Sequence, residues 1–562
     1  MKISILPFLS ISIIITVITA CTSSKISVKT KPEVISNSVD LIDDIGFKSW
    51  SHKDLKTDNI PGISLDKAYE FLKNKKGKKV IVGVIDSGVD IEHEDLKDVI
   101  WVNKKEIPNN NIDDDKNGFV DDINGWNFLG SDKGNSYLEQ LEMTRIVSNM
   151  HDRFKDKEYK DIPLGDIADF NEYSKLKDEV LTKQVRNQVS FDLQREKLED
   201  VEKYKKIISK VLNVDNFSVF DLKKLKSNDY DIVKASKVLN TLLELDSQLD
   251  IESLEKHIHR VMEYYGSKHY VLNFNGRAIV GDNVYDIEDK NYGNNDVIGF
   301  KDKESHGTHV AGIISATRNN GKGIDGIADN VEIMTVRAVP DGDEYDKDVA
   351  LAIRYAVDNG AKVINMSFGK SHSPNKQWVF DAIKYAEKHD VILVNAAGNS
   401  ALNIDIEHTY PNDSKDLTNE ISNNFITVGA TSIDYNKNLL AVFTNYGKKN
   451  VDVFAPGVEI YSTTPRDNYQ FFSGTSMAAP TVAGVASLIR SYYPSLSAKQ
   501  VKHILMNSGT DVDIKVALPF KSSEIPNNEL ITDTNLSSIS VSGKIVNAYN
   551  ALVMADKMAS KN

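Results

Sequence analysis

Three short segments of the chain carry residues whose types could together perform nucleophilic catalysis. Asp86 ends a β-branched run, His306 stands in Ser305-His306-Gly307-Thr308-His309, and Ser476 follows a glycine turn in Ser473-Gly474-Thr475-Ser476-Met477. A serine hydroxyl is a weak nucleophile that needs an adjacent base, and histidine suits that role near neutral pH. A buried carboxylate fixes the imidazole tautomer. The pattern predicts Ser476 as the nucleophile, His306 as the base, and Asp86 as the residue that orients His306.

Each of these residues also has an ordinary structural interpretation when it is taken alone. A serine after Gly-Thr is commonly a helix cap, a histidine before glycine is commonly at the surface, and Asp90 or Asp95 could replace Asp86 as the carboxylate. His309 lies three residues after His306, a spacing that permits metal ligation, but we expect it to be a packing or capping residue. Only the combination of Asp86, His306 and Ser476 therefore points to catalysis.

The elements that must position these residues alternate between buried strands and amphipathic helices. Hydrophobic runs without alternation occupy 79–85, 332–339, 361–368, 391–397 and 425–429, and helical patterns occupy 348–358 and 377–389. This order predicts an α/β fold with a doubly wound, mainly parallel sheet and helices on both faces. Asp86 then ends a parallel strand, where such sheets place their sites. Ser476 begins a helix, and Pro480 is expected in its first turn.

The three motifs, and the order Asp, His, Ser, resemble those of the subtilisin-like serine proteases. The resemblance covers roughly residues 60–130 and 270–556. It implies a serine endopeptidase that hydrolyses peptide bonds in polypeptide substrates.

The same resemblance assigns further residues around the nucleophile. Asn399 in Ala396-Ala397-Gly398-Asn399 matches the family's amide donor to the oxyanion. Ser367, Phe368 and Gly369 match the segment whose backbone pairs with substrate as an added strand. With Ala396, Ala397 and Gly398 they are expected to form the walls of the pocket for the residue before the scissile bond.

An acidic loop at 111–122 places oxygen-bearing residues at alternating positions. Asp113, Asp115, Asn117 and the Phe119 carbonyl stand at positions 1, 3, 5 and 7 of an EF-hand-like loop, and Gly118 stands at its sharp turn. Position 12 is not a glutamate, so the closing carboxylate must come from Asp122 or Asp121. The loop also resembles one found in a subset of subtilases. We expect a structural Ca²⁺ here, and a solvated acidic turn is the alternative.

Asp95 lies where the family's other calcium site takes a carboxylate. The following loop, Asn319-Asn320-Gly321, departs from the family in length, so this second site stays open.

Residues 131–266 interrupt the α/β pattern with a highly charged stretch that is poor in Gly and Pro. Helical spacing around 198–211 and a second long helical pattern over 232–265 predict an all-α insertion, as a hairpin or small bundle. In the sequence the insertion lies between Asp86 and His306. It is either a solvated addition without chemistry of its own, or it binds a protein partner or gates the site.

The amino terminus predicts export. Residues 1–20 form a short basic and then apolar segment, and Ile18-Thr19-Ala20-Cys21 resembles the lipobox of bacterial lipoproteins. This implies a membrane-anchored, exported bacterial lipoprotein with lipid on Cys21, facing the periplasm or the cell exterior. A plain signal peptide or an uncleaved span is the alternative. Residues 21–59 are expected to be a tether, followed by the catalytic domain at 60–130 and 267–556.

Composition excludes several other classes of protein. Cys21 is the only cysteine in 562 residues, which rules out an intrachain disulfide framework and a Cys-based zinc site. The formal net charge of −13 argues against a general nucleic-acid binder. Two functions remain: a membrane-tethered serine endopeptidase, and a catalytically silent binding protein that keeps the fold and uses its insertion to hold a partner.

Overall fold

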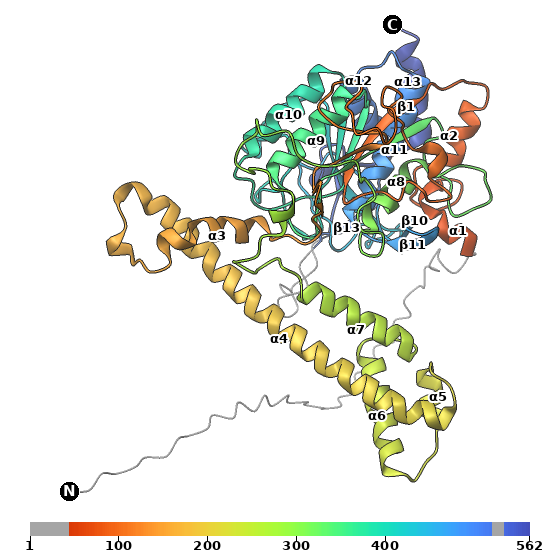
Figure 1. Cartoon of the computed structure of the whole chain (residues 1–562). Helices are drawn as coiled ribbons and strands as arrows, with labels where there is room; N and C mark the ends of the chain where they lie inside the picture. Colours follow the sequence, from red (N-terminus) through yellow and green to blue (C-terminus); the bar gives the residue numbers. More distant parts are fainter. Residues whose placement is uncertain (1–43, 520–532, 562) are drawn as a thin grey trace.

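A computed structural model describes residues 44–519 and 533–561 (Figure 1). A nine-stranded sheet forms its centre, in the order β12-β15-β9-β8-β7-β6-β1-β5-β2. The strands are β1 (Val80–Asp86), β2 (Gly125–Asn127), β5 (Val331–Arg337), β6 (Val363–Met366), β7 (Ile392–Ala396), β8 (Phe425–Thr431), β9 (Val453–Pro456), β12 (Thr510–Asp511) and β15 (Lys544–Ile545). All neighbouring strands pair in parallel except β12 with β15.

Two hydrophobic cores cover the two faces of the sheet, which confirms the predicted doubly wound α/β class. One core joins Val82 and Val84 of β1 to α2 (Leu65–Leu72), α8 (His306–Ser315), α11 (Thr475–Tyr492), α12 (Ala498–Ser508) and α13 (Ala548–Ala559). The other joins Ile85 to α9 (Asp346–Asp358) and α10 (Lys376–Lys388). Successive side chains of β1 face opposite cores because strand residues alternate, so a continuous apolar run is needed.

The strand order places Asp86 at the point where the winding of the chain reverses. After β1 the chain adds β5 on one side, and it then builds β6, β7, β8 and β9 on the other. Ligand sites of open parallel sheets lie at the carboxyl ends of the strands beside such a reversal. The fold therefore places a carboxylate at that position.

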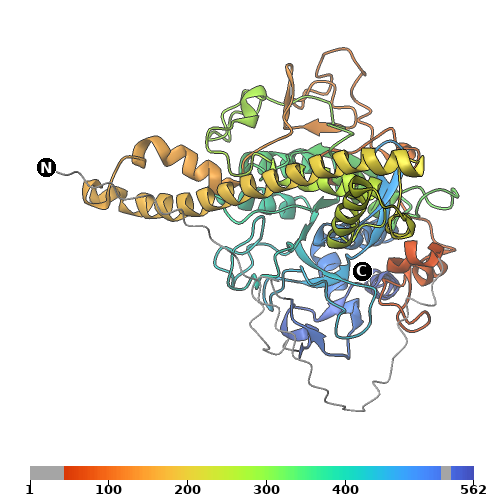
Figure 2. The same ribbon diagram turned by 90° about the horizontal axis from the view of Figure 1, so that it is seen from below.

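The insertion extends from the body as a helical arm (Figure 1). It contains α3 (Glu142–Phe154), α4 (Ile167–Leu212), α5 (Val219–Lys224), α6 (Tyr230–Leu245) and α7 (Ile251–Tyr265). In the view from below, the 46-residue α4 crosses in front of the body (Figure 2). The arm has two small cores of its own, one between α3 and the first half of α4, the other among the second half of α4 and α5 to α7.

The second long helical pattern of the sequence is two helices in the structure. Helix α6 ends at Leu245, Ser247 takes a positive φ of 53°, and the Asp250 side chain accepts from the backbone N–H of Ser253 to begin α7. The left-handed residue and the cap allow α7 to fold back and bury Ile251, Leu254 and Ile258 against α4 and α6.

The structure differs from two further expectations, on the tether before the catalytic domain and on the position of Pro480. The carboxyl end of the expected tether packs into the body, because Trp50 is 1% exposed and its indole N–H donates to the Glu459 carbonyl. Pro480 is the sixth residue of α11 and thus lies beyond the first turn.

The expected signal segment and Cys21 lie outside the described residues. Among the helices that the structure does describe, none is both long and apolar enough to span a bilayer.

Candidate active site

Asp86 and His306 form the geometric centre of the site. Asp86 ends β1 with 2% exposure, and its Oδ1 accepts from His306 Nδ1 at 2.8 Å and from the Ser87 backbone N–H at 2.7 Å. Its other oxygen, Oδ2, is buried and has no hydrogen-bond partner in the described part of the chain. His306 is the first residue of α8, and 38% of its side chain is exposed. The bond fixes the proton on Nδ1 and leaves Nε2 free to act as a base.

The environment of His306 changes its basicity in two opposing ways. Burial lowers the pKa of the ring, while the charge of Asp86 and the hydrogen bond to it raise the pKa, and together these exceed the effect of burial. The pKa of His306 is consequently raised above 6.5. A stronger base accepts the serine proton more readily.

A close approach of two backbones brings α8 to β1. A β-carbon on Gly307 would lie 2.2 Å from the Gly88 carbonyl oxygen and 3.1 Å from Cβ of Asp86. Only glycine leaves room for this contact. The packing that joins Asp86 to His306 therefore requires the glycine after the histidine.

Arg337 supports the same region from the neighbouring strand. It is the register partner of Asp86 in β5, and its side chain is fully buried. Its guanidinium donates to the Ser87 carbonyl at 2.7 Å and to Glu304 Oε1 at 2.5 Å. It thereby links the turn after Asp86 to the segment before His306, a role that the sequence motifs did not reveal.

Ser476 is the second residue of α11. Its hydroxyl donates to the Ser367 carbonyl at 3.1 Å, and the Ser367 hydroxyl donates to the Ser476 carbonyl at 2.9 Å. That carbonyl is available because Pro480, four residues later, has no N–H to donate to it. Within the described residues no hydrogen bond joins the Ser476 hydroxyl to His306. In substrate-free sites such bonds are often long and tighten only with substrate.

Asn399 presents an amide group beside Ser476. Its Oδ1 accepts from the backbone N–H and the hydroxyl of Thr475, at 2.8 and 2.9 Å. Because a backbone N–H can only donate, the accepting atom is Oδ1, and Nδ2 has no acceptor among the residues that the structure describes. A methyl group on Gly474 would lie 3.4 Å from Asn399 Nδ2 and 3.6 Å from the Ser476 backbone nitrogen, so both donors border the same small space. Two such donors suit a developing oxyanion.

A cleft of about 160 Å³ opens beside Ser476. All six residues expected to bind substrate line it, namely Ser367, Phe368, Gly369, Ala396, Ala397 and Gly398. Asn399, Thr475 and Tyr410 line it as well, and no acidic side chain of the described residues does. A larger cavity of about 750 Å³ lies between α5 and α6, far from these residues in the chain and lined by none of them.

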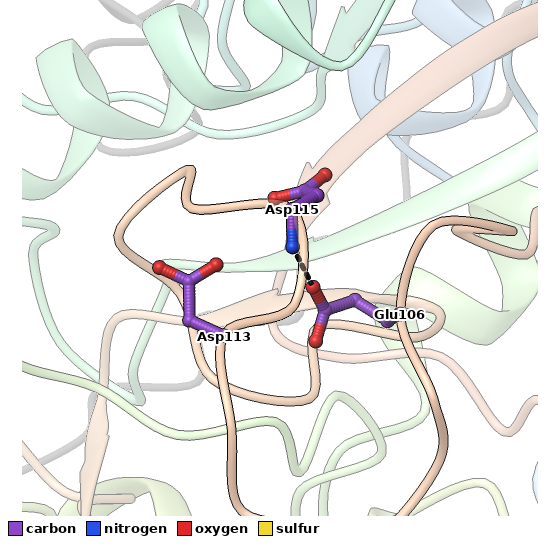
Figure 3. Close-up of side chains that lie close together, drawn as sticks. All are labelled: Glu106, Asp113 and Asp115. Atoms are coloured by element: carbon purple, nitrogen blue, oxygen red, sulfur yellow. Dashed lines mark hydrogen bonds between the residues drawn. The ribbon is translucent and has the colours of Figure 1, made fainter.

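The acidic loop gathers three carboxylates. Glu106, Asp113 and Asp115 each offer an oxygen within 4.8 Å of the other two (Figure 3). Both oxygens of Asp113 accept backbone N–H groups, from Asn117 and Gly118, and those of Glu106 accept from Asp115 and Asp121. These bonds fix the positions of the Asp113 and Glu106 carboxylates. Hard oxygen ligands in a tight turn fit Ca²⁺.

The other expected ligands, Asn117, Phe119 and Asp122, do not belong to this group of three carboxylates. Asn117 and Phe119 belong to the same turn, where Asn117 Oδ1 accepts from the Phe119 N–H. Asp121 accepts from the N–H groups of Asn110 and Asn111. Asp122 is not a member of the carboxylate group. It is fully buried, accepts from the Tyr355 hydroxyl at 2.6 Å, and has its pKa raised to about 6 by burial. Glu106, which lies before the motif, was missed by the sequence pattern.

The structure also shows the surroundings of Asp95 and His309, whose roles the sequence left undecided. Asp95 is buried and accepts from the Asn320 amide at 2.6 Å, so the structure brings it to the loop considered for a second calcium ion. His309 is fully buried, and its ring stacks on that of Phe472 with 4.3 Å between the ring centres. Its Nε2 forms a hydrogen bond with the Gln470 carbonyl at 3.0 Å. Burial lowers the pKa of His309 to about 3, so it is a neutral packing residue.

Comparison with known proteins places this geometry in a family. Residues 77–522 match the Subtilase family, Peptidase_S8. The chain is 40% identical over 221 residues to "Thermophilic serine proteinase" of Bacillus sp. (strain AK1), covering 39% of this chain and 48% of that protein. It is 37% identical over 212 residues to "Subtilisin DY" of Bacillus licheniformis, covering 38% and 72%.

A solved structure of proteases from Pseudoalteromonas arctica PAMC 21717 matches 49% of this chain and 82% of its own, at 26% identity and a TM-score of 0.38. The chain spans about half the length of several curated relatives that it matches. The match over residues 77–522 includes Asp86, His306, Asn399 and Ser476, and the chain belongs to the subtilase family.

Proposed function

We propose that the protein is a serine endopeptidase that hydrolyses peptide bonds in polypeptides. The observation that carries this proposal is the 2.8 Å bond between Asp86 and His306, at the same strand ends as a cleft that Ser476 and Asn399 line. Ser476 attacks the scissile carbonyl, His306 Nε2 takes its proton and passes it to the leaving amine, and Asp86 stabilises the imidazolium. Asn399 Nδ2 and the Ser476 N–H donate to the oxyanion.

The Ser476 hydroxyl must break one existing hydrogen bond before it can react. In the structure this hydroxyl donates to the Ser367 carbonyl, and that bond must break before the hydroxyl can donate to His306 Nε2. Ser367 belongs to the segment that pairs with substrate, so binding of a peptide and release of this bond involve the same backbone.

The decisive experiment compares wild type with Ser476→Ala on casein and on a peptide library. Wild type is expected to cleave and to be inactivated by a sulfonyl or phosphonyl fluoride. The alanine variant is expected to lose about 10⁶-fold in kcat, the loss known for this nucleophile in subtilisin. Binding of peptides without turnover by wild type would instead indicate the silent binding protein.

We further propose a structural Ca²⁺ held by Glu106, Asp113 and Asp115. The closeness of these carboxylates supports it, because three anions within 4.8 Å of one another repel, and the one ammonium group paired with them among the described residues is that of the exposed Lys105, 3.7 Å from Asp115. The ion's role is to hold this turn.

We also propose that the protein is an exported lipoprotein anchored through Cys21 and facing the periplasm or the cell exterior, with the lipobox resemblance as support. Cys21→Ser is expected to release it from the membrane fraction, and unchanged fractionation contradicts the anchor.

A further inference from the structure

Lys370 connects the substrate-binding segment to a buried network of charges. It directly follows Gly369, and only 2% of its side chain is exposed. Its Nζ contacts Glu142 Oε2 at 2.8 Å, Asp346 Oδ1 at 2.9 Å and the Glu344 carbonyl at 2.8 Å. Although Lys370 borders the cleft, its ammonium group is therefore bound behind the cleft wall.

The backbone of Lys370 is held from the opposite direction. Its N–H donates to the Tyr410 carbonyl and its carbonyl accepts from the Tyr410 N–H, both at 2.8 Å. Tyr410 lines the same cleft. The segment from Ser367 to Lys370 is thus fixed at one end by the two bonds between Ser367 and Ser476, and at the other end by Lys370.

Glu142 belongs to the insertion, as the first residue of α3. One turn later Arg145 pairs with Glu142 at 2.6 Å and donates to the Asp343 carbonyl at 2.7 Å and the Glu344 carbonyl at 3.1 Å. Its guanidinium also lies 3.9 Å from the centre of the Tyr345 ring. The first helix of the arm is in this way fastened to two body segments, 343–346 and Lys370.

The charges in this network depend on one another. Glu142 is buried between Arg145 and Lys370, with 10% of its side chain exposed. Removing one member leaves its buried partners with fewer opposite charges around them, a less favourable state than the complete network. The docked helix α3 therefore supplies one of the two carboxylates that hold the Lys370 ammonium, while Asp346 of the body supplies the other. The position of the adjoining substrate segment depends on Lys370 and, through it, on the docking of α3.

We propose that Lys370 is a positioning residue for the Ser367–Gly369 substrate segment, and that through its ion pair with Glu142 the insertion sets the affinity of the cleft for extended peptides. This rests on the proposed peptidase function. A peptide binds the segment as an added strand. If the segment is not held in place, binding must also order it, and this loss of conformational entropy weakens the affinity for the peptide. A small ester contacts the segment only as a wall of the pocket beside Ser476 and does not pair with its backbone as an added strand, so its binding depends less on the position of the segment.

The test compares two substrates with the same residue before the scissile bond, a tetrapeptide anilide and an N-acetyl amino-acid ester. Rates are expressed per active site, titrated with a fluorophosphonate. Lys370→Met is expected to raise KM for the tetrapeptide about tenfold with kcat nearly unchanged, and to leave both constants for the ester within about twofold. Lys370→Arg, which keeps the charge, is expected to recover part of the tetrapeptide KM.

Two more variants keep the outcome decisive. Glu142→Gln changes the network from the insertion side, conserves shape, and is expected to give the same selective rise in KM even if Lys370→Met does not fold. Lys197→Met is the control, because it removes an ion pair with Asp246 at 3.0 Å inside the arm, and it is expected to leave KM unchanged.

Equal losses on both substrates, or unchanged KM in Lys370→Met and Glu142→Gln, overturn the proposal. Absence of turnover by wild type on both substrates overturns the proposed function itself, so the two failures are distinguishable.

Discussion

Nδ1 of His306 lies 2.8 Å from Oδ1 of Asp86, although 220 sequence positions separate the two residues. The intervening chain adds β2 to the sheet, forms the five helices of the arm and returns to the body well before α8, since Val280 and Tyr292 pack in the core of the body. The pair is nevertheless set by the contact of α8 with β1, where Gly307 meets the backbone of Gly88. The insertion therefore lengthens the connection between Asp86 and His306 without entering their contact.

The pH dependence of kcat/KM should report the raised pKa of His306. The base must be neutral, so activity is lost as the pH falls through this pKa, and we expect the acid limb to have its midpoint above 6.5. Asp86→Asn removes the charge that raises the pKa, so the limb should move to lower pH while kcat falls about 10⁴-fold. A limb that Asp86→Asn leaves in place contradicts the assignment of this pair.

Asn399→Ala should lower kcat about 10²–10³-fold with little change in KM, because its amide donates to charge that exists only in the transition state. Steady-state kinetics per titrated active site provide the measurement. Asn438→Ala, in the exposed turn after β8, is the matched control and should behave as wild type. A large rise in KM with kcat preserved would assign Asn399 to ground-state binding instead.

Gly307→Ala should separate the catalytic pair. Its new β-carbon would lie 2.2 Å from a backbone oxygen, so α8 must shift, and a displacement of about 1 Å can reduce kcat/KM about 10²-fold. Overpacking of this kind also costs about 1–3 kcal/mol of stability, measurable as a lower Tm. Gly165→Ala has no atom within 4 Å of its new methyl group and should be neutral in both measurements. Wild-type kinetics in Gly307→Ala would show that this contact does not set the geometry.

Chelation of calcium should lower the Tm of wild type. An ion present at 100 times its Kd stabilises the folded state by about 2.7 kcal/mol, which is lost with the ion. Asp115→Asn should start from a lower Tm and respond little to chelator, whereas Asp132→Asn, an exposed carboxylate outside the group, should respond as wild type does. Equal chelator responses in wild type and Asp115→Asn would remove the proposed ion from this loop.

The sequence by itself determined the elements and much of the site. Strand β1 follows from an unbroken β-branched run, because a strand buried on both faces needs apolar side chains on both, and Asp86 is the first residue that ends it. The starts of α8 and α11 follow from motifs that carry His306 and Ser476. These are local properties, since periodicity and turn-forming residues act over a few positions.

Only the tertiary structure decided which distant residues meet. Glu106 joins Asp113 and Asp115 from outside their motif, the helical pattern over 232–265 breaks at Ser247 to bury α7, and Trp50 leaves the expected tether for the body. Lys370 is an ordinary lysine in the sequence until folding places Glu142 and Asp346 around it. Such contacts depend on packing and on the pairing of buried charges, and neither is encoded in the spacing of neighbouring residues.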